Sequence, residues 1–537
     1  MSETQQILKS TRVVTLLTLV SRVSGYVRDL AIALLLGTSL AADAFVIAFR
    51  IPNLLRRLMA EGAMTAAFIP VFTSHRAQRP DAETWDFARR MFWTLATVLA
   101  AVTLLGMIFA PELVALFTLA HPDPSQWAHA VLLTRITLPF CLLVSLTALA
   151  GAILNTFRVF GLPAAVPIYL NLAIIASAFV SWLLGYADPA LALALGVLVG
   201  GVLQFAAQIP ALVRRGMSFR FALGFSDPGV RRVGALMLPA VAGVGIYQIN
   251  VLVTTAFASQ REGWISALYY ADRIMEVALG AYAISVATVV LPVMSQQAVE
   301  NRLAEMCATL TFALRNVAFI VIPAAAGLIV LRDPIVRVLF QHRAFGSDST
   351  SLTAYALLFY AIGLPAFAAV RLVVQGFYAM KDTATPVKVS ALALAVNIGL
   401  CFLLLGPLGH GGLALATSVA SYVNLVVLYL LHRSRVGRVD EPRLALSLFR
   451  SAVAASAMAL ACWLLNREFL AGTANFGLLL AAFVATIALG VVIYMAVAWL
   501  LRAEELGEFY TLLTGRQRAF NRFAGVGGAV PGASHPK

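Results

Sequence analysis

Charged residues are scarce in this chain. Only 12% of its 537 residues are Asp, Glu, Lys or Arg, whereas 61% are hydrophobic, and the mean hydropathy is +0.88. A soluble globular domain carries about a quarter charged residues, so this composition excludes one over any large part of the chain. The apolar runs recur from end to end, without the period-two alternation of a membrane β-barrel. The sequence therefore predicts an all-α, polytopic membrane protein.

Motifs for metal, redox and nucleotide chemistry are also missing from the sequence. The four cysteines stand alone, and no histidines or cysteines show the spacing of a metal site. No GxxxxGK[ST] phosphate loop occurs, so the chain has no ATPase site of its own. The loops hold few carboxylates and no acidic pair. We therefore expect no enzyme activity, no metal and no cofactor, while coupling to the membrane potential or to a monovalent cation stays open.

Positive charge is in excess, with a formal net charge of +14. Nucleic-acid binding is one interpretation of such an excess, but here the basic residues gather in alternate loops, as the positive-inside rule predicts for cytoplasmic loops. They are Arg76, Arg79, Arg89, Arg90, Arg214, Arg215, Arg220, Arg231, Arg232, Lys381, Lys388, Arg433, Arg435, Arg438 and Arg443. The intervening loops are poorer, with exceptions at Arg261, Arg343 and Arg467. We expect no nucleic-acid partner and place both termini in the cytoplasm.

Fourteen apolar stretches are long enough to cross a bilayer. They cover roughly residues 13–37, 41–73, 90–110, 128–157, 163–186, 190–213, 233–257, 264–295, 315–331, 352–379, 387–405, 411–431, 445–465 and 476–501. Four of these spans approach 30 residues and must be tilted, kinked or extended beyond the bilayer. Gly62 and Pro70 are candidates to break the second span, and Gly280 and Pro292 the eighth.

The second and eighth spans resemble each other. Ala44–Ile51 (AFVIAFRI) matches Ala267–Ile274 (ALYYADRI) at an offset of 223 residues, which aligns Arg50 with Arg273. An even number of spans in each half makes the halves parallel repeats, related by a pseudo-two-fold axis normal to the membrane. Chance similarity of two apolar helices is the alternative. The predicted parts are two six-span lobes, two further spans and a cytoplasmic tail with a disordered end, at residues 1–220, 221–443, 444–502 and 503–537.

Three charged residues lie inside the first span, at Arg22, Arg28 and Asp29. The two arginines lie about 14 and 22 Å from the start of the span at Val13. A charge at such depth costs from about 3 to more than 10 kcal/mol, so it persists where it faces water, a partner charge or a ligand. Ser24-Gly25 could kink the helix and turn all three toward one hydrated cavity that receives an anion. A buried Arg22–Asp29 pair that only orders packing is the alternative.

Further charged residues occur in the second and eighth spans. Arg273 lies at a depth similar to that of Arg28, and the arginine fork suits a diphosphate; a local salt bridge is the alternative. Arg50 could line the same cavity. Asp43, at the outer start of the second span, is either an outer gate residue or a helix N-terminal charge. At the inner end, Arg56, Arg57 and Glu61 could form a gate, with loop anchoring as the alternative.

At these residues the chain resembles the MurJ/MviN family, the lipid II flippases of the multidrug/oligosaccharidyl-lipid/polysaccharide exporter superfamily. The resemblance is carried by Ser21–Asp29 (SRVSGYVRD), Asp43–Phe72 (DAFVIAFRIPNLLRRLMAEGAMTAAFIPVF) and Tyr269–Glu276 (YYADRIME). It covers nearly the whole chain. It implies that Arg22, Arg28 and Arg273 are the cavity arginines with Asp29 as their acidic partner. It also implies that Asp43 is the outer gate, that Arg56, Arg57 and Glu61 form the inner gate, and that spans 13 and 14 hold a lipid tail.

The function implied is transport of lipid II, the undecaprenyl-diphosphate-linked disaccharide-pentapeptide, to the outer leaflet of the bacterial inner membrane by alternating access. Membrane lipids and other cell-wall synthesis proteins are the further partners to expect. The sodium site of the family is in doubt, because spans 7, 11 and 12 hold Asn250, Asn397 and Asn424 but no Asp or Glu. Alternatives are a flippase for another polyprenyl-diphosphate glycan such as O-antigen, a drug exporter, a lipid-linked glycosyltransferase, and an envelope-assembly scaffold.

Overall fold

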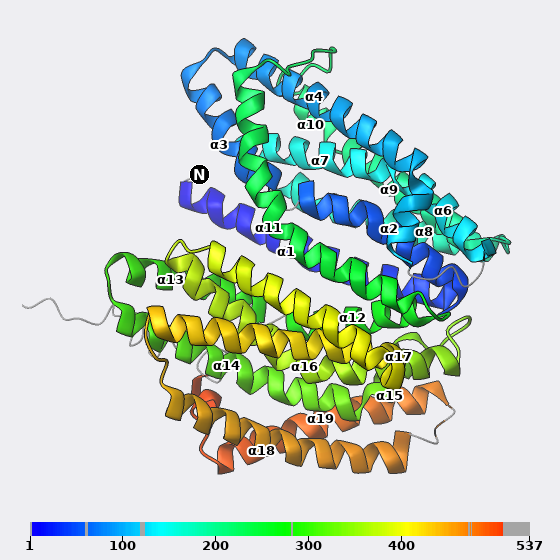
Figure 1. Ribbon diagram of the computed structural model, residues 1–537, viewed down its shortest axis with the longest axis vertical. Coiled ribbons are helices and arrows are strands. Elements are labelled where there is room, and N and C mark those ends of the chain that lie inside the picture. Colours follow the sequence, from blue (N-terminus) through cyan, green and yellow to red (C-terminus); the bar gives the residue numbers. More distant parts are fainter. Residues whose placement is uncertain are drawn as a thin grey trace, which may run out of the picture. The chain divides into compact units, whose positions relative to one another are not determined.

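Helices account for all the regular structure in the part of the chain that the computed structural model describes (Figure 1). That part comprises residues 3–59, 63–118, 124–280, 283–470, 473 and 475–508. The all-helical class predicted from composition is therefore confirmed. The disordered end predicted for the tail lies outside the described residues.

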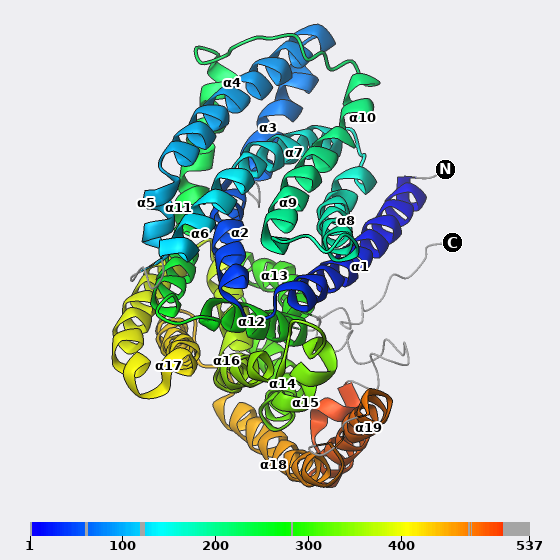
Figure 2. The same ribbon diagram turned by 90° about the vertical axis from the view of Figure 1, so that its right-hand side faces the viewer.

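The first of two compact units consists of Met1–Tyr270 and Leu339–Leu352. The helices that lie wholly within it are α1 (Glu3–Leu36), α2 (Leu40–Met59), α3 (Ala63–Gln78), α4 (Asp81–Ile108), α5 (Ala110–Leu116), α6 (Pro124–Thr137), α7 (Pro139–Thr156), α8 (Gly161–Leu183), α9 (Pro189–Ala206), α10 (Ile209–Val213) and α11 (Pro228–Ala258). In this unit α8 lies between α1 and α9 (Figure 2). That placement brings α8 against the charged part of α1.

The second unit consists of Ala271–Val338 and Thr353–Lys537. Its helices are α13 (Ala283–Val299), α14 (Leu303–Val330), α17 (Ala384–Arg435), α18 (Glu441–Leu465), a π-helical turn (Asn466–Leu470) and α19 (Phe476–Leu500). Three helices contribute residues to both units: α12 (Trp264–Gly280), α15 (Arg332–Phe340) and α16 (Ser347–Ala379).

Nine helical stretches in the described chain are long and apolar enough to cross a membrane, or ten if α12 and α13 together form one bent span. The nine coincide with predicted spans 3 to 6, 9, 10, 13 and 14, and with spans 11 and 12 taken together. Those two share the label α17, but Gly409 between them is non-helical, with φ 55° and ψ −137°, a conformation suited to glycine. The predicted spans 11 and 12 are therefore two helices that meet at a kink. The chain is thus a multi-pass helical protein, while the number of 14 spans stays a prediction.

The predicted second and eighth spans each correspond to two described helices. These are α2 and α3 for the second span, and α12 and α13 for the eighth. The breaks expected at Gly62 and Gly280 stay predictions, because residues 60–62 and 281–282 lie outside the described residues. The proposed breaks at the prolines are wrong, because Pro70 lies inside α3 and Pro292 inside α13. A proline removes one backbone donor, and a helix with neighbouring partners can continue through it.

The turns that follow α7 and α16 have the same geometry. Arg158 and Lys381, 223 residues apart, both adopt a left-handed backbone conformation, with φ of 58° and 62°. In each turn the amide of the next residue donates to the carbonyl oxygen of the fourth residue before the basic one, Leu154 or Phe377. The same closure occurs at Gly185, Gly216, Asn301 and Arg502, so it is a common way of ending a helix and does not test the repeat. The internal repeat and the lobe boundaries stay predictions.

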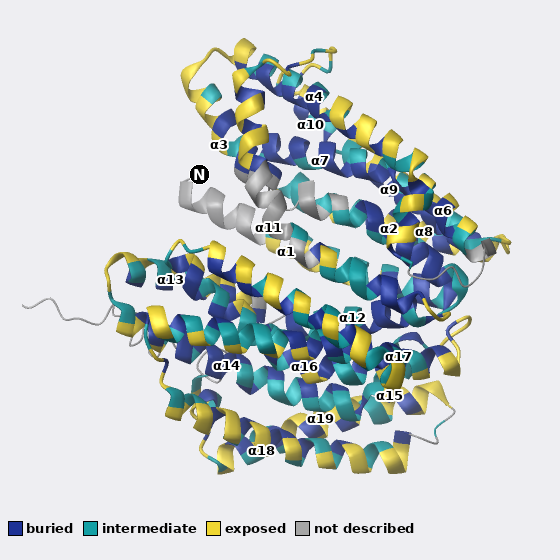
Figure 3. Cartoon of the chain, viewed as in Figure 1, coloured by how far each residue is buried: buried dark blue, intermediate teal, exposed yellow. Residues whose placement is uncertain are grey.

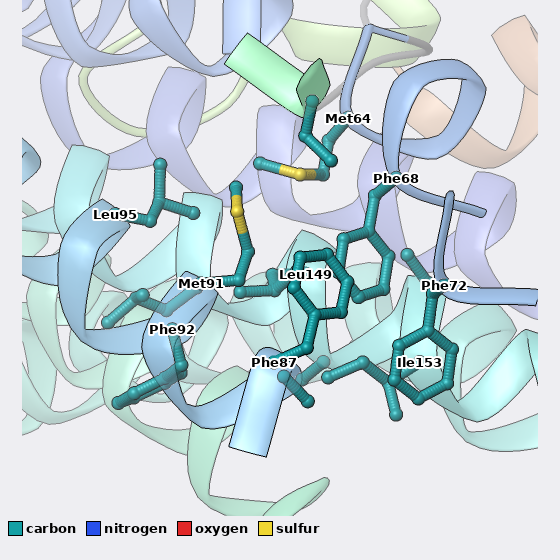
Figure 4. Packing of buried hydrophobic residues seen from close by; sticks show 14 of the residues in the cluster. Met64, Phe68, Phe72, Phe87, Met91, Phe92, Leu95, Leu149 and Ile153 are labelled. Atoms are coloured by element: carbon teal, nitrogen blue, oxygen red, sulfur yellow. The ribbon is translucent and has the colours of Figure 1, made fainter. Parts of the chain in front are cut away.

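Aromatic side chains from α3 and α4 pack with aliphatic side chains from α7 in one core of the first unit (Figure 4). Phe68 stacks on Phe72 at 5.2 Å and on Phe87 at 5.9 Å between ring centroids. Leu149 and Ile153 of α7 are fully buried in the same cluster. Truncation of one of these aromatic rings to alanine costs about 3–5 kcal/mol. This packing fixes α3 against the unit.

Many residues of α18 and α19 are exposed (Figure 3), and large hydrophobic side chains are among them. Phe449, Trp499 and Leu500 expose 63%, 71% and 73% of their surfaces. Side chains of this kind on a continuous exposed face are covered by lipid chains in a membrane protein. The exposed surface thus agrees with membrane insertion of this helix pair.

Candidate functional site

Arg28 and Asp29 form an ion pair within α1. Arg28 Nε and Nη2 donate to Asp29 Oδ1 at 3.0 and 2.7 Å, and the two side chains are only 13% and 6% exposed. The Arg28 guanidinium also lies 5.7 Å from the ring centroid of Phe49 on α2. The acidic partner expected for Arg28 is therefore its neighbour in the chain. Such pairing lowers the cost of holding each charge inside an apolar helix.

Asn171 of α8 completes the surroundings of Arg28. Arg28 Nη1 donates to Asn171 Oδ1 at 3.0 Å, while Asn171 Nδ2 donates to Ser24 Oγ at 2.9 Å and to the Ser21 carbonyl oxygen at 3.2 Å. Asn171 is 4% exposed. An amide is both donor and acceptor, so one side chain can satisfy a cation and two oxygens together.

Tyr269 of α12 extends the cluster to Arg50. Its hydroxyl donates to Asp29 Oδ1 at 3.0 Å, and its ring centroid lies 5.9 Å from the Arg50 guanidinium. Arg50 Nη1 also donates to Thr255 Oγ1 on α11. Arg50 therefore lies in the same polar cluster as Arg28 and Asp29. We name this set of residues, Ser24, Arg28, Asp29, Arg50, Asn171, Thr255 and Tyr269, the α1 polar cluster.

Arg22 lies on α1 and is exposed, as is its neighbour Val23. The helix continues through Ser24-Gly25, and the kink expected at that point stays a prediction. The alternative of a buried Arg22–Asp29 pair is not the pairing that α1 adopts, because Asp29 is bonded to Arg28. An arginine side chain is long enough to reach a ligand beside α1 without a bend in the helix.

Arg273 belongs to the second unit and is held by acidic residues of its own helix. Arg273 Nη1 lies 2.5 Å from Glu276 Oε2, and Arg273 Nη2 lies 3.9 Å from Asp272 Oδ2. The side chain is 25% exposed. The local salt bridge considered as the alternative for this residue is therefore present. Any anion that binds Arg273 has to replace or share Glu276.

Asp43 caps the start of α12. Its Oδ2 accepts from the Gly263 amide at 2.7 Å and its Oδ1 from the Ser266 amide at 2.8 Å, and the residue is 1% exposed. These amides are among the first of α12, which have no partners within the helix. Asp43 is thus a helix N-terminal charge in the first turn of its own helix, α2, and it also caps the start of α12. Whether it also acts as a gate stays a prediction.

The inner-gate residues are only partly described. Arg56 Nε donates to Asn53 Oδ1 at 2.7 Å, one turn earlier on α2. The side chain of Arg57, and Glu61 as a whole, lie outside the described residues. The gate formed by these residues therefore stays a prediction. Within the described ranges, no group of three or more His, Cys, Asp or Glu is placed to hold a metal ion.

Sequence reasoning did not single out Asn171, Tyr269, Thr255 or Glu276 as site residues. Tyr269 and Glu276 lie inside the segment Tyr269–Glu276, whose spacing places Glu276 one helical turn from Arg273. That spacing was a usable signal for the local pair. Asn171 and Thr255 gave no comparable signal, because isolated polar residues in apolar helices are common and their partners lie 143 and 205 positions away.

The chain matches known proteins over most of its length. Residues 32–501 match the family described as "Lipid II flippase MurJ". A "Probable lipid II flippase MurJ" of Vibrio cholerae is 38% identical over 436 residues, which is 79% of this chain and 82% of the relative. A "Lipid II flippase MurJ" of Burkholderia cenocepacia is 37% identical over 425 residues, or 78% and 82% of the two chains.

Solved structures agree with this match. A structure described as "Lipid II flippase MurJ, inward closed conformation" superposes with a TM-score of 0.78 at 27% identity, covering 91% of this chain and 99% of that chain. An inward-facing multidrug resistance transporter of the MATE family, 14% identical, gives 0.65 over 78% and 94% and shares the fold alone. These are transporters, so the expectation that the chain is not an enzyme is confirmed. On this evidence the chain belongs to the lipid II flippase MurJ family.

Proposed function

We propose that this protein moves lipid II from the cytoplasmic to the outer leaflet of the bacterial inner membrane. The observation that carries the proposal is the α1 polar cluster, in which Arg28, Asp29 and Arg50 lie among polar side chains of neighbouring helices, in a member of a flippase family. A polar headgroup cannot cross hydrocarbon unaided, so its carrier has to offer a polar path.

The diphosphate of the substrate docks on Arg22, Arg28 and Arg273, with Asp29 orienting Arg28. Arginine suits this role because its guanidinium stays ionised and donates bidentate hydrogen bonds to phosphate oxygens. Two features of the described contacts support the assignment. Arg22 is exposed, and the partner of Arg273 is an acidic side chain on the same helix, so a diphosphate could exchange with it. Arg50, which donates to Thr255 and lies beside the Tyr269 ring in the same cluster, lines the path.

Transport proceeds by alternating access of the two six-span lobes, with both termini in the cytoplasm. The polyprenyl tail stays in lipid along α18 and α19, which expose large hydrophobic side chains. The membrane potential supplies about 2.3 kcal/mol per elementary charge per 100 mV, which favours outward movement of an anionic headgroup. Asp43 at the outer end, and Arg56 with Arg57 and Glu61 at the inner end, act as gates. Coupling to a monovalent cation is a second route for driving the cycle.

Complementation tests the proposal. Cells depleted of the protein receive wild type, Arg28→Ala, Arg273→Ala or the control Arg135→Ala at matched membrane levels, and externalised lipid II is measured. Arg135 is exposed, and its one bond among the described residues is to the Met107 carbonyl oxygen at 3.1 Å, so its loss should be harmless. Wild type and the control should restore externalised lipid II, and the two cavity variants should not.

Two other outcomes of this experiment would contradict the proposal. Equal rescue by all four proteins would make the arginines structural and favour a scaffold. Unchanged lipid II externalisation in the depleted cells would indicate a different lipid-linked cargo, such as an O-antigen carrier.

A further inference from the structure

Asn171 is the residue that α8 contributes to the α1 polar cluster, among the residues that the structure describes. It lies in the middle of an apolar, 23-residue helix and is 4% exposed. Burial of an amide without hydrogen bonds is costly, so a buried Asn in such a helix is held by its partners. Here the partners are a cation, a hydroxyl and a backbone carbonyl, all on α1.

From this geometry we propose that Asn171 is a positioning residue for the diphosphate-binding Arg28, an inference that rests on the proposed function. Asp29 binds the Nε and Nη2 side of the guanidinium, and Asn171 binds Nη1 from a second helix. The plane of the guanidinium is therefore fixed from two directions. A flexible arginine that is already oriented loses less conformational freedom when an anion binds.

The chemistry of an amide explains the residue type at position 171. Its carbonyl oxygen holds Arg28 without adding negative charge, whereas a second carboxylate beside Asp29 would compete with an anionic ligand. Its NH2 group donates to Ser24 Oγ and to the Ser21 carbonyl oxygen, which fixes the orientation of the amide. A leucine of similar volume makes none of these bonds.

Binding of undecaprenyl diphosphate to the purified, full-length protein tests the inference. The proteins to compare are wild type, Asn171→Leu, Arg28→Ala and the double variant. Asn171→Leu should weaken binding about tenfold, since a hydrogen bond to a charged group is lost. The same change should have no further effect in the Arg28→Ala background, because Asn171 acts through Arg28. This non-additivity is a readout that a merely structural role would not produce.

Gln204→Leu is the matched control. Gln204 of α9 is 3% exposed and donates to the Val166 carbonyl oxygen of α8 at 3.0 Å, so it is a buried amide at the same helix but has no described contact with an arginine. Its loss should lower thermal stability and leave the affinity for undecaprenyl diphosphate unchanged. If Asn171→Leu does not accumulate, Ser24→Ala is the second variant, because it removes one hydrogen bond of the Asn171 amide. It should weaken binding twofold to threefold, and again only when Arg28 is present.

The inference is overturned if Asn171→Leu binds as wild type does, or if its effect is as large without Arg28 as with it. An affinity that Arg28→Ala does not change would instead overturn the proposed function, and the inference with it. The two failures are therefore distinguished by the Arg28→Ala protein alone.

Discussion

Tyr269 is the residue through which Asp29 and Arg50 are joined. Its hydroxyl donates to the buried carboxylate of Asp29 and its ring lies beside the Arg50 guanidinium. These two contacts use different parts of one side chain. Removing the hydroxyl and removing the ring should therefore have separable effects.

Tyr269→Phe should lower the free energy of unfolding by about 1–2 kcal/mol, because a buried carboxylate loses one donor. Tyr269→Leu should lower it further and also disturb Arg50, since the ring is lost. Thermal or denaturant unfolding of the purified proteins measures the difference. Equal stability of Tyr269→Phe and wild type would show that the hydroxyl adds nothing to the cluster.

Asp43 allows a second test at the scale of one residue. Each of its carboxylate oxygens accepts one backbone N–H at the start of α12. Asparagine offers only one acceptor oxygen there, so Asp43→Asn should lose one of the two bonds and cost about 1–2 kcal/mol. Hydrogen exchange at Gly263 and Ser266 should become faster at one amide in the Asn variant and at both in Asp43→Ala. Unchanged protection in Asp43→Ala would exclude the capping role.

At the scale of helices, a buried ion-pair network joins α14, α18 and the segment after α19. Arg315 of α14 is 4% exposed and lies 2.5 Å from Glu505 Oε1, which also accepts from Ser447 Oγ of α18 at 2.7 Å. Asn316 donates to Glu508 at 2.7 Å. Since all of these partners belong to the second unit, residues 504–508 fasten the last two helices to α14.

Breaking this network from one side should be more harmful than removing both charges. Arg315→Met leaves Glu505 buried without its cation and should lower the free energy of unfolding by about 3–5 kcal/mol. The double variant Arg315→Met with Glu505→Met should be more stable than Arg315→Met alone. Arg443→Gln is the control, because its pair with Glu504 is nearly half exposed and should contribute about 1 kcal/mol or less. The free energies of unfolding of the purified variants give their order of stability. A double variant less stable than Arg315→Met would contradict the account.

At the scale of the whole molecule, much of the fold could be predicted because a bilayer imposes long apolar helices on the sequence. Hydropathy located the helical stretches, including the two predicted spans that meet at the non-helical Gly409 within α17. It could not show that α3 and α13 continue through their prolines, which depends on neighbouring helices.

The candidate site was predictable in its charges but not in its partners. Arg28 and Asp29 stand out in the sequence because charge is costly inside an apolar span. The bonds that hold them come from Asn171 and Tyr269, on helices distant in the chain, and no local pattern specifies these contacts. For Arg273 the sequence left an anion site and a local salt bridge open, and Glu276, at helical spacing, is the partner that the structure shows.

The most direct test of the central claim is lipid II movement across vesicles that contain only the purified protein. Fluorescent lipid II is placed in both leaflets, and the fraction open to an external quencher is followed with time. Wild type and Arg135→Ala should expose the inner pool faster than protein-free vesicles do, whereas Arg28→Ala should match the protein-free rate. Equal rates for wild type and Arg28→Ala would contradict the role of the α1 polar cluster in transport.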